Sequence, residues 1–251
     1  MRINKDRDIG QVLYIVEGSS TEFNLLKKIF CDVLGFEYTE KRRNKQKVFQ
    51  KKRNDFCRSK IAVINTSNSN IADISDDEYL ESLFQMLINE CRFPVDKAAI
   101  YYLFDRDPKS NSQEAIRRYI DMLKDPMDND DCMKAGLLLL SYPCIESYMV
   151  SSFIENTYEI EFGIGKDLKR YIGENQAIQM NKLSEETILF ATNEFLAYLQ
   201  NLGLELDVDN FSETSHTIFE GQEEKYAAEN VYSLFSMLTL SFIQMGIIEL
   251  D

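Results

Sequence analysis

The fold class is decided by one stretch of sequence, Ala99-Ile100-Tyr101-Tyr102-Leu103-Phe104-Asp105-Arg106-Asp107. An unbroken apolar run of this kind predicts a buried strand, and here the run stops at two acids. A second apolar run, residues 12–16, leads in the same way into Glu17 and Glu22. These acids are expected to converge, because α/β proteins bind ligands at the carboxyl ends of parallel strands. Converging carboxylates repel one another unless a hard cation binds them, so the sequence predicts a magnesium site.

Predicted strands and helices alternate along the first 155 residues. The expected strands are 11–17, 61–65, 98–104 and 136–140, and the expected helices are 21–34, 76–91, 113–123 and 144–153. This alternation predicts an α/β domain with a parallel sheet flanked by helices. The remainder is expected to be α-helical, over 164–180, 184–202 and 223–248. We therefore predict an α/β domain over residues 1–155 and a helical C-terminal region over 156–251 that packs on it.

Residues 41–60 form a basic segment in an otherwise acidic chain. The net charge is −14, yet ten of the 28 basic residues and a single acid fall in this segment. A concentrated basic segment can bind the phosphates of nucleic acid, or it can be a solvated loop or hairpin without a partner. Composition leaves both readings open. Under the first reading, the side chains assigned to nucleic acid are Lys41, Arg42, Arg43, Lys45, Lys47, Lys51, Lys52 and Arg53.

Several classes of protein are disfavoured by simple counts. The five cysteines form no CxxC pair, which indicates reduced thiols rather than a disulfide framework or a zinc site. The N-terminus has no apolar signal region, so a cytoplasmic location is expected. Residues 230–248 carry no charge but contain many polar side chains, which favours a buried helix over a membrane span. The single histidine, His216, lies in a polar stretch, so histidine-based catalysis is nearly excluded.

A third junction between a strand and a helix supplies Glu146, in Ser141-Tyr142-Pro143-Cys144-Ile145-Glu146. At the earlier junction, Asp105 and Asp107 are expected on one side, since side chains alternate along an extended chain. Carboxylate oxygens suit Mg²⁺ or Mn²⁺, and a set that bridges two ions would clamp a phosphodiester. Any one of these acids is more simply explained as a turn former or helix cap. That explanation weakens when three junctions carry acids.

Three motifs in this order resemble the TOPRIM fold of topoisomerases, bacterial primases and OLD-family nucleases. They are Glu17-Gly18-x-x-x-Glu22, Asp105-Arg106-Asp107 and Pro143-Cys144-x-Glu146, each after a predicted strand. The closer resemblance is to the small TOPRIM nucleases of phage defence, the RloB-like and OLD-like group. It covers residues 11–155, and the combination of motifs is more specific than any one of them.

The resemblance implies a nuclease that depends on Mg²⁺ or Mn²⁺ and cleaves DNA or RNA, tRNA included. Glu17 would take part in acid–base chemistry and bind metal. Asp105 and Asp107 would be metal ligands, and Glu22 and Glu146 would complete the site or bind a second ion. A downstream lysine often assists in such nucleases. Lys166 and Lys169 are the candidates for it, although either could equally be an exposed helix lysine.

The chain has no GxxxxGK[ST] motif, so an ATPase activity would have to come from a separate partner protein, as in related defence systems. The basic insert at 41–60 lies outside the TOPRIM core, and the resemblance gives it no role. A homo-oligomer is left open, and no membrane partner is expected. Two alternatives remain. One is a non-catalytic TOPRIM-like subunit of a defence ATPase, and the less favoured one is a haloacid-dehalogenase-type phosphatase, which would leave Glu17 and Glu22 unexplained.

Overall fold

The computed structural model describes residues 1–18, 20–41, 46–53, 57–66, 77–89, 92–109, 112–127 and 136–250. The chain divides into two compact units. The N-terminal unit comprises Lys5–Leu103 and Met122–Leu138, and the C-terminal unit comprises Met1–Asn4, Phe104–Asp121 and Leu139–Asp251. This division cuts through two strands rather than falling at residue 155, and the predicted domain boundary there stays a prediction.

Within the described residues, one sheet has the strand order β11-β8-β6-β2-β5-β4-β3, with β7 beside β8. The strand β2 (Gln11–Val16) lies between β5 (Cys57–Asn65) and β6 (Ala98–Asp105) and is parallel to both, with Tyr14 opposite Val63 and Tyr101. The remaining strands are β3 (Glu37–Lys41), β4 (Gln46–Arg53), β7 (Lys124–Asp125), β8 (Gly136–Tyr142) and β11 (Phe235–Ser236). The predicted α/β class, with parallel central strands and flanking helices, is confirmed.

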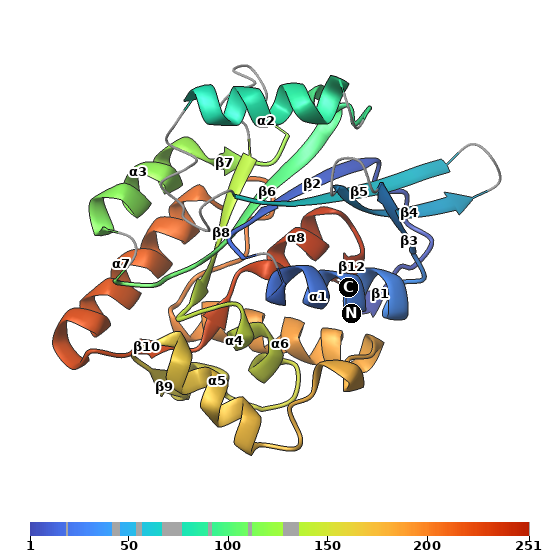
Figure 1. Cartoon of the computed structure of the whole chain (residues 1–251). Coiled ribbons are helices and arrows are strands. Elements are labelled where there is room, and N and C mark those ends of the chain that lie inside the picture. The colour runs from blue at the N-terminus through green and yellow to red at the C-terminus, as the bar shows by residue number, and fades with distance from the viewer. Residues whose placement is uncertain are drawn as a thin grey trace. The chain divides into compact units, whose positions relative to one another are not determined.

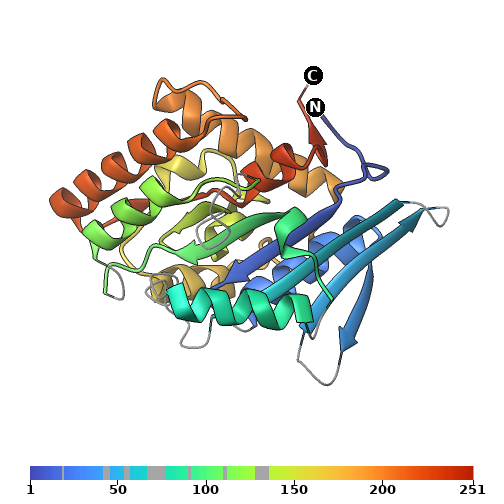
Figure 2. The same cartoon turned by 90° about the horizontal axis from the view of Figure 1, so that it is seen from above.

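In the N-terminal unit, helices lie on both faces of the sheet. Helix α1 (Thr21–Lys27) continues as a π-helical segment, Lys28–Val33, and confirms the helix expected over 21–34. Figures 1 and 2 show α1 and α2 (Asp77–Asn89) on opposite sides of β2 and β5. The face beneath α1 is aromatic, with the Phe23 and Phe30 rings stacked on that of Phe49. Contacts between such rings stabilise the packing by more than the burial of their apolar area alone.

The basic segment is largely sheet within this unit. Strand β4 runs antiparallel to both β3 and β5, so the described parts of residues 41–60 are paired strands. Of the two forms left open, hairpin and loop, the described residues show antiparallel strands, and the description as an insert is incomplete, because β4 and β5 belong to the central sheet. Residues 42–45 and 54–56 lie outside the described part of the chain.

The C-terminal unit is mostly helical. Its helices are α3 (Gln113–Met122), α4 (Glu146–Ser151), α5 (Gly165–Glu174), α6 (Glu185–Asn201), α7 (Ser212–Glu229) and α8 (Leu238–Gln244). The last residue of α3, Met122, is assigned to the N-terminal unit. Helix α4 packs against α5 and α6, which lie beside it in Figure 1. Two short antiparallel pairs complete the unit: β1 (Arg2–Ile3) with β12 (Ile248–Glu249), and β9 (Glu161–Phe162) with β10 (Tyr232–Ser233). Short 3₁₀ turns cover Val95–Lys97 in the N-terminal unit and Thr157–Glu159 and Met180–Lys182 in this one.

The helix expected over 223–248 is wrong. Helix α7 ends where Asn230 adopts a left-handed conformation with φ of 59°, which asparagine tolerates better than most residues. The chain then forms β10 and β11, and β11 pairs antiparallel with β8 through Phe235 and Tyr142. Only then does α8 begin. None of the helices in the described residues combines the length and apolarity needed to cross a membrane.

A candidate metal site at Asp105 and Glu146

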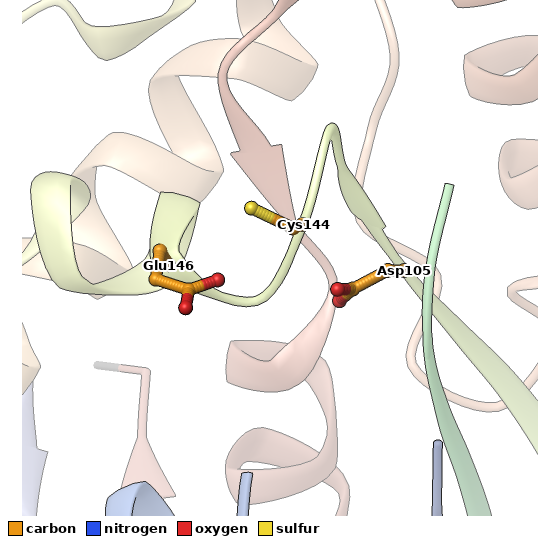
Figure 3. Close-up of side chains that lie close together, drawn as sticks. All are labelled: Asp105, Cys144 and Glu146. Carbon is orange, nitrogen blue, oxygen red and sulfur yellow. The ribbon is translucent and has the colours of Figure 1, made fainter. Parts of the chain in front are cut away.

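Strand β6 ends at Asp105, whose carboxylate points toward the turn between β8 and α4 (Figure 3). The backbone N–H of Ile145 donates a hydrogen bond of 2.7 Å to Asp105 Oδ1. Cys144 and Glu146 flank Ile145 on this turn. One potential ligand atom from each of Asp105, Cys144 and Glu146 lies within 4.8 Å of the other two. The geometry therefore joins two of the predicted metal ligands with a thiol.

Glu146 is the first residue of α4, and its side chain is only 12% exposed. Its Oε1 lies 3.3 Å from the ammonium of Lys169. Its Oε2 is buried and accepts no hydrogen bond from the described residues. A buried acceptor without a donor is costly, and a bound cation would relieve that cost. This oxygen is the feature of the group that most favours a ligand.

Lys169, on α5, is the predicted lysine that the structure places at this group. Burial on its own would lower the pKa of Lys169, but the Glu146 carboxylate, aided by Cys144 and Asp105, raises it above its ordinary value. The side chain therefore remains a cation at neutral pH while it lies beside the two carboxylates. Lys166, the other candidate, is exposed in the first turn of the same helix and forms no ion pair within the described part of the chain.

Cys144 is a member of the group that composition could not single out. Burial, together with the nearby Asp105 and Glu146, raises the pKa of its thiol. Helix α5 begins against this side chain, because a Cβ atom on Gly165 would lie 2.9 Å from the Cys144 Sγ. A larger residue at position 165 would therefore require the Cys144 side chain to shift. The signal that could have found Cys144 is its place in the third motif, two residues before Glu146.

Asp107 is not a member of the group formed by Asp105, Cys144 and Glu146. Its Oδ1 accepts a hydrogen bond of 2.9 Å from the backbone N–H of Lys109, an arrangement typical of an aspartate that starts a turn. The role of Asp107 as a metal ligand stays a prediction. Between the two aspartates, Arg106 is almost fully buried, at 2% exposure, which the sequence does not predict.

Glu17 and Glu22 belong to the N-terminal unit, where the spacing of their motif has a local explanation. Glu22 is buried and folds back so that its Oε1 accepts the Gly18 N–H at 3.2 Å. A Cβ atom on Gly18 would lie 2.6 Å from Glu22 Oε2, so a larger residue there would displace the Glu22 carboxylate from its place beside Gly18. The backbone N–H of Glu17 donates to Leu103 O at 3.3 Å, which places Glu17 just beyond the last pair of β2 and β6.

The described basic side chains of the β4 strand already have partners within the N-terminal unit. Lys51 donates a hydrogen bond of 2.8 Å to Leu34 O and a second to Lys5 O, so it supports the end of the π-helical segment. The Lys47 ammonium lies 3.8 Å from the centre of the Phe23 ring, a favourable cation–π contact. For Lys41, Lys52 and Arg53 the structure describes only the backbone, and Arg42, Arg43 and Lys45 lie outside the described residues. Their assignment to nucleic acid stays a prediction.

Comparison with known proteins yields no match, whether with family models, with curated proteins or with solved structures. What this chain does must therefore be argued from its motifs and from the geometry of the group formed by Asp105, Cys144, Glu146 and Lys169.

Proposed function

We propose that this protein is a metal-dependent nuclease of the TOPRIM type, which hydrolyses phosphodiester bonds. The observation that carries the proposal is the meeting of Asp105 and Glu146. They follow different strands of the sheet, and one ligand atom of each lies within 4.8 Å of the other and of a Cys144 ligand atom. The buried Oε2 of Glu146 accepts no hydrogen bond from the described residues. Carboxylate oxygens fit Mg²⁺ or Mn²⁺. Burial and the neighbouring acids raise the pKa of the Cys144 thiol, so the two carboxylates rather than the sulfur would hold the ion.

In this proposal, Asp105 and Glu146 hold the ion, and Ile145 fixes the Asp105 carboxylate through its N–H. A bound divalent ion supplies Lewis-acid stabilisation of a phosphoryl oxygen and a more acidic water. Lys169 pairs with Glu146, and its ammonium can exchange this partner for a phosphate oxygen of the substrate. The metal and acid–base roles of Glu17, Glu22 and Asp107 rest on the resemblance to the TOPRIM motifs alone.

The wider biology follows the same resemblance and is part of the proposal. The substrate would be DNA or RNA, with tRNA as one candidate, since phosphate contacts carry no sequence information. The protein would act in the cytoplasm as the effector of an anti-phage system, together with a separate ATPase. The alternative of a non-catalytic subunit predicts metal binding without cleavage, and a phosphatase predicts release of phosphate from monoesters.

The first test is stabilisation by metal. If the site binds Mn²⁺ and the unfolded chain does not, Mn²⁺ at a hundred times its dissociation constant should stabilise the fold by about 2.7 kcal/mol. Asp105→Asn should abolish this gain, which thermal unfolding with and without Mn²⁺ would measure. Asp121→Asn is the control and should retain the gain, because Asp121 pairs with His216 and has no part in the proposed site. Wild-type protein that is not stabilised by Mn²⁺ or Mg²⁺ would contradict the proposal.

The second arm of the test is cleavage. Plasmid, single-stranded DNA and bulk tRNA are incubated with wild-type protein and Mn²⁺, and with the Glu146→Gln and Glu17→Gln variants. Both variants should lose cleavage. Activity that survives Glu17→Gln would remove the role assigned to Glu17, and metal binding without cleavage of any of these substrates would favour the non-catalytic subunit.

A further inference from the structure

A buried ion pair is formed by Arg106, the residue that follows Asp105 of the proposed metal site. Arg106 Nε and Nη2 donate hydrogen bonds of 2.7 Å each to Glu223 Oε1 and Oε2 on α7. Both side chains are nearly inaccessible, at 2% and 5% exposure. The hydroxyl of Tyr232 donates a further bond of 3.1 Å to Glu223 Oε1. The two charges are therefore held in one fixed, bidentate geometry.

Such a pair adds little net free energy of folding. Taking both ions out of water costs about as much as their attraction returns, and hydrophobic side chains of similar size often stabilise a protein equally well. What a bidentate pair adds is direction, because the planar guanidinium matches a carboxylate in one orientation only. The position of Arg106 in the chain indicates which group this fixed orientation positions.

Arg106 is the residue between Asp105 and Asp107, and it anchors the chain in two ways. Its backbone N–H donates a hydrogen bond of 2.8 Å to Ser141 O on β8, and its side chain is bound to α7. Because successive side chains of an extended chain point to opposite sides, an inward Arg106 turns the Asp105 carboxylate outward, toward Ile145 N–H at 2.7 Å. The rotation of the strand end is thereby fixed on both sides.

We propose that Arg106 is a positioning residue, which through Glu223 orients Asp105 for metal binding. The proposal rests on the proposed metal site and adds to it a determinant in the interior of the C-terminal unit. Arg106 itself touches no ligand. Its removal should therefore lower metal affinity through geometry alone, by about tenfold or more, the loss that outer partners of metal ligands typically cause.

The test measures the dissociation constant of Mn²⁺ by electron paramagnetic resonance at a temperature where each variant is folded by circular dichroism. Arg106→Lys keeps the charge but loses the fork, and it should bind Mn²⁺ about tenfold more weakly. The double variant Arg106→Met, Glu223→Met removes both charges and leaves neither one buried alone. It should fold and should also bind Mn²⁺ more weakly, so it decides the matter if Arg106→Lys does not fold.

The chain offers a control pair whose glutamate lies on the same helix, α7. Arg117 of α3 pairs with Glu220 of α7 at 2.7 and 2.9 Å, and like Arg106 its guanidinium lies about 6 Å from the Phe219 ring. Arg117→Met, Glu220→Met should leave the Mn²⁺ affinity unchanged. Unchanged affinity in both Arg106 variants, or an equal loss in the control, would overturn the positioning role. Wild-type protein without Mn²⁺ affinity would instead overturn the metal site and this role together.

Discussion

Asp105, Arg106 and Asp107 show what a short sequence pattern predicts about individual side chains and what it does not. The alternation of an extended chain predicts the two aspartates on one side, but it says nothing of their partners. Asp107 is engaged by Lys109 N–H, two residues away, whereas Asp105 reaches Ile145, 40 residues away. The partner of Arg106 is 117 residues away. The joining of Asp105 with Glu146 was predicted from the shared edge of the strands, but the burial of Arg106 depends on a distant helix and could not be.

Lys169 gives a prediction at the same scale. A lysine whose pKa is raised by folding stabilises the protein below its ordinary pKa of 10.5 and loses this effect as the pH rises through the folded-state value. Lys169→Met should therefore lower the free energy of unfolding at pH 8, by less than about 1 kcal/mol because the side chain is 55% exposed. The deficit should shrink at pH 11. Urea unfolding at both values measures it.

Lys166→Met is the control for this experiment, since Lys166 is exposed on the same helix and forms no described ion pair. It should change the free energy of unfolding at neither pH. A deficit of Lys169→Met that is as large at pH 11 as at pH 8 would show that packing of the side chain, rather than its charge beside Glu146, is responsible.

At the scale of elements, the four expected strands are confirmed as β2, β5, β6 and β8, because their apolar runs are uninterrupted and end at acids or turns. The short strands β1, β7, β9, β10, β11 and β12 have no such runs and were not predicted. The predicted helix over 223–248 failed for a physical reason: residues 231–242 are apolar at spacings that suit a helix, yet a buried strand satisfies them equally well. The pairing that decides between the two, Phe235 with Tyr142, joins distant parts of the chain. The left-handed residue Asn230, which ends α7, is a local signal of the change.

Asn230 therefore carries a prediction about this boundary. Its φ of 59° is unfavourable for residues with an ordinary side chain. Asn230→Ala should lower the free energy of unfolding by about 1 kcal/mol, whereas Asn230→Gly should not destabilise the protein to the same degree, since glycine adopts this conformation freely. Urea unfolding of the three proteins measures both values. If alanine and glycine were equivalent, the helix would not end at Asn230 as described.

At the scale of the whole molecule, the residues of the candidate site are divided between the units. Asp105, Cys144, Glu146 and Lys169 belong to the C-terminal unit, and Glu17 and Glu22 to the N-terminal one. The sequence predicted that acids at several strand ends act together, from the general behaviour of parallel sheets. Two of the predicted acids meet in the structure, and the contribution of Glu17 and Glu22 awaits a measurement on the intact protein.

Hydrogen exchange with and without Mn²⁺ supplies that measurement. Binding at Asp105 and Glu146 should slow exchange of backbone amides in α4 and in the first turns of α5, because ligands suppress local opening. If Glu17 and Glu22 also bind metal, as the TOPRIM motifs predict, the amides at the start of α1 should be protected as well. Protection confined to α4 and α5 would contradict the role of Glu17 and Glu22. Asp105→Asn, which should show no protection anywhere, is the control.

The path of the chain through the two units has one more consequence. It passes from one unit to the other after Asn4, Leu103, Asp121 and Leu138, so neither unit is a continuous segment. A single genetic exchange at any point between the first and the last of these positions would break at least one unit. The segments that contain Glu17 and Asp105 are therefore not independent modules that recombination could exchange one at a time.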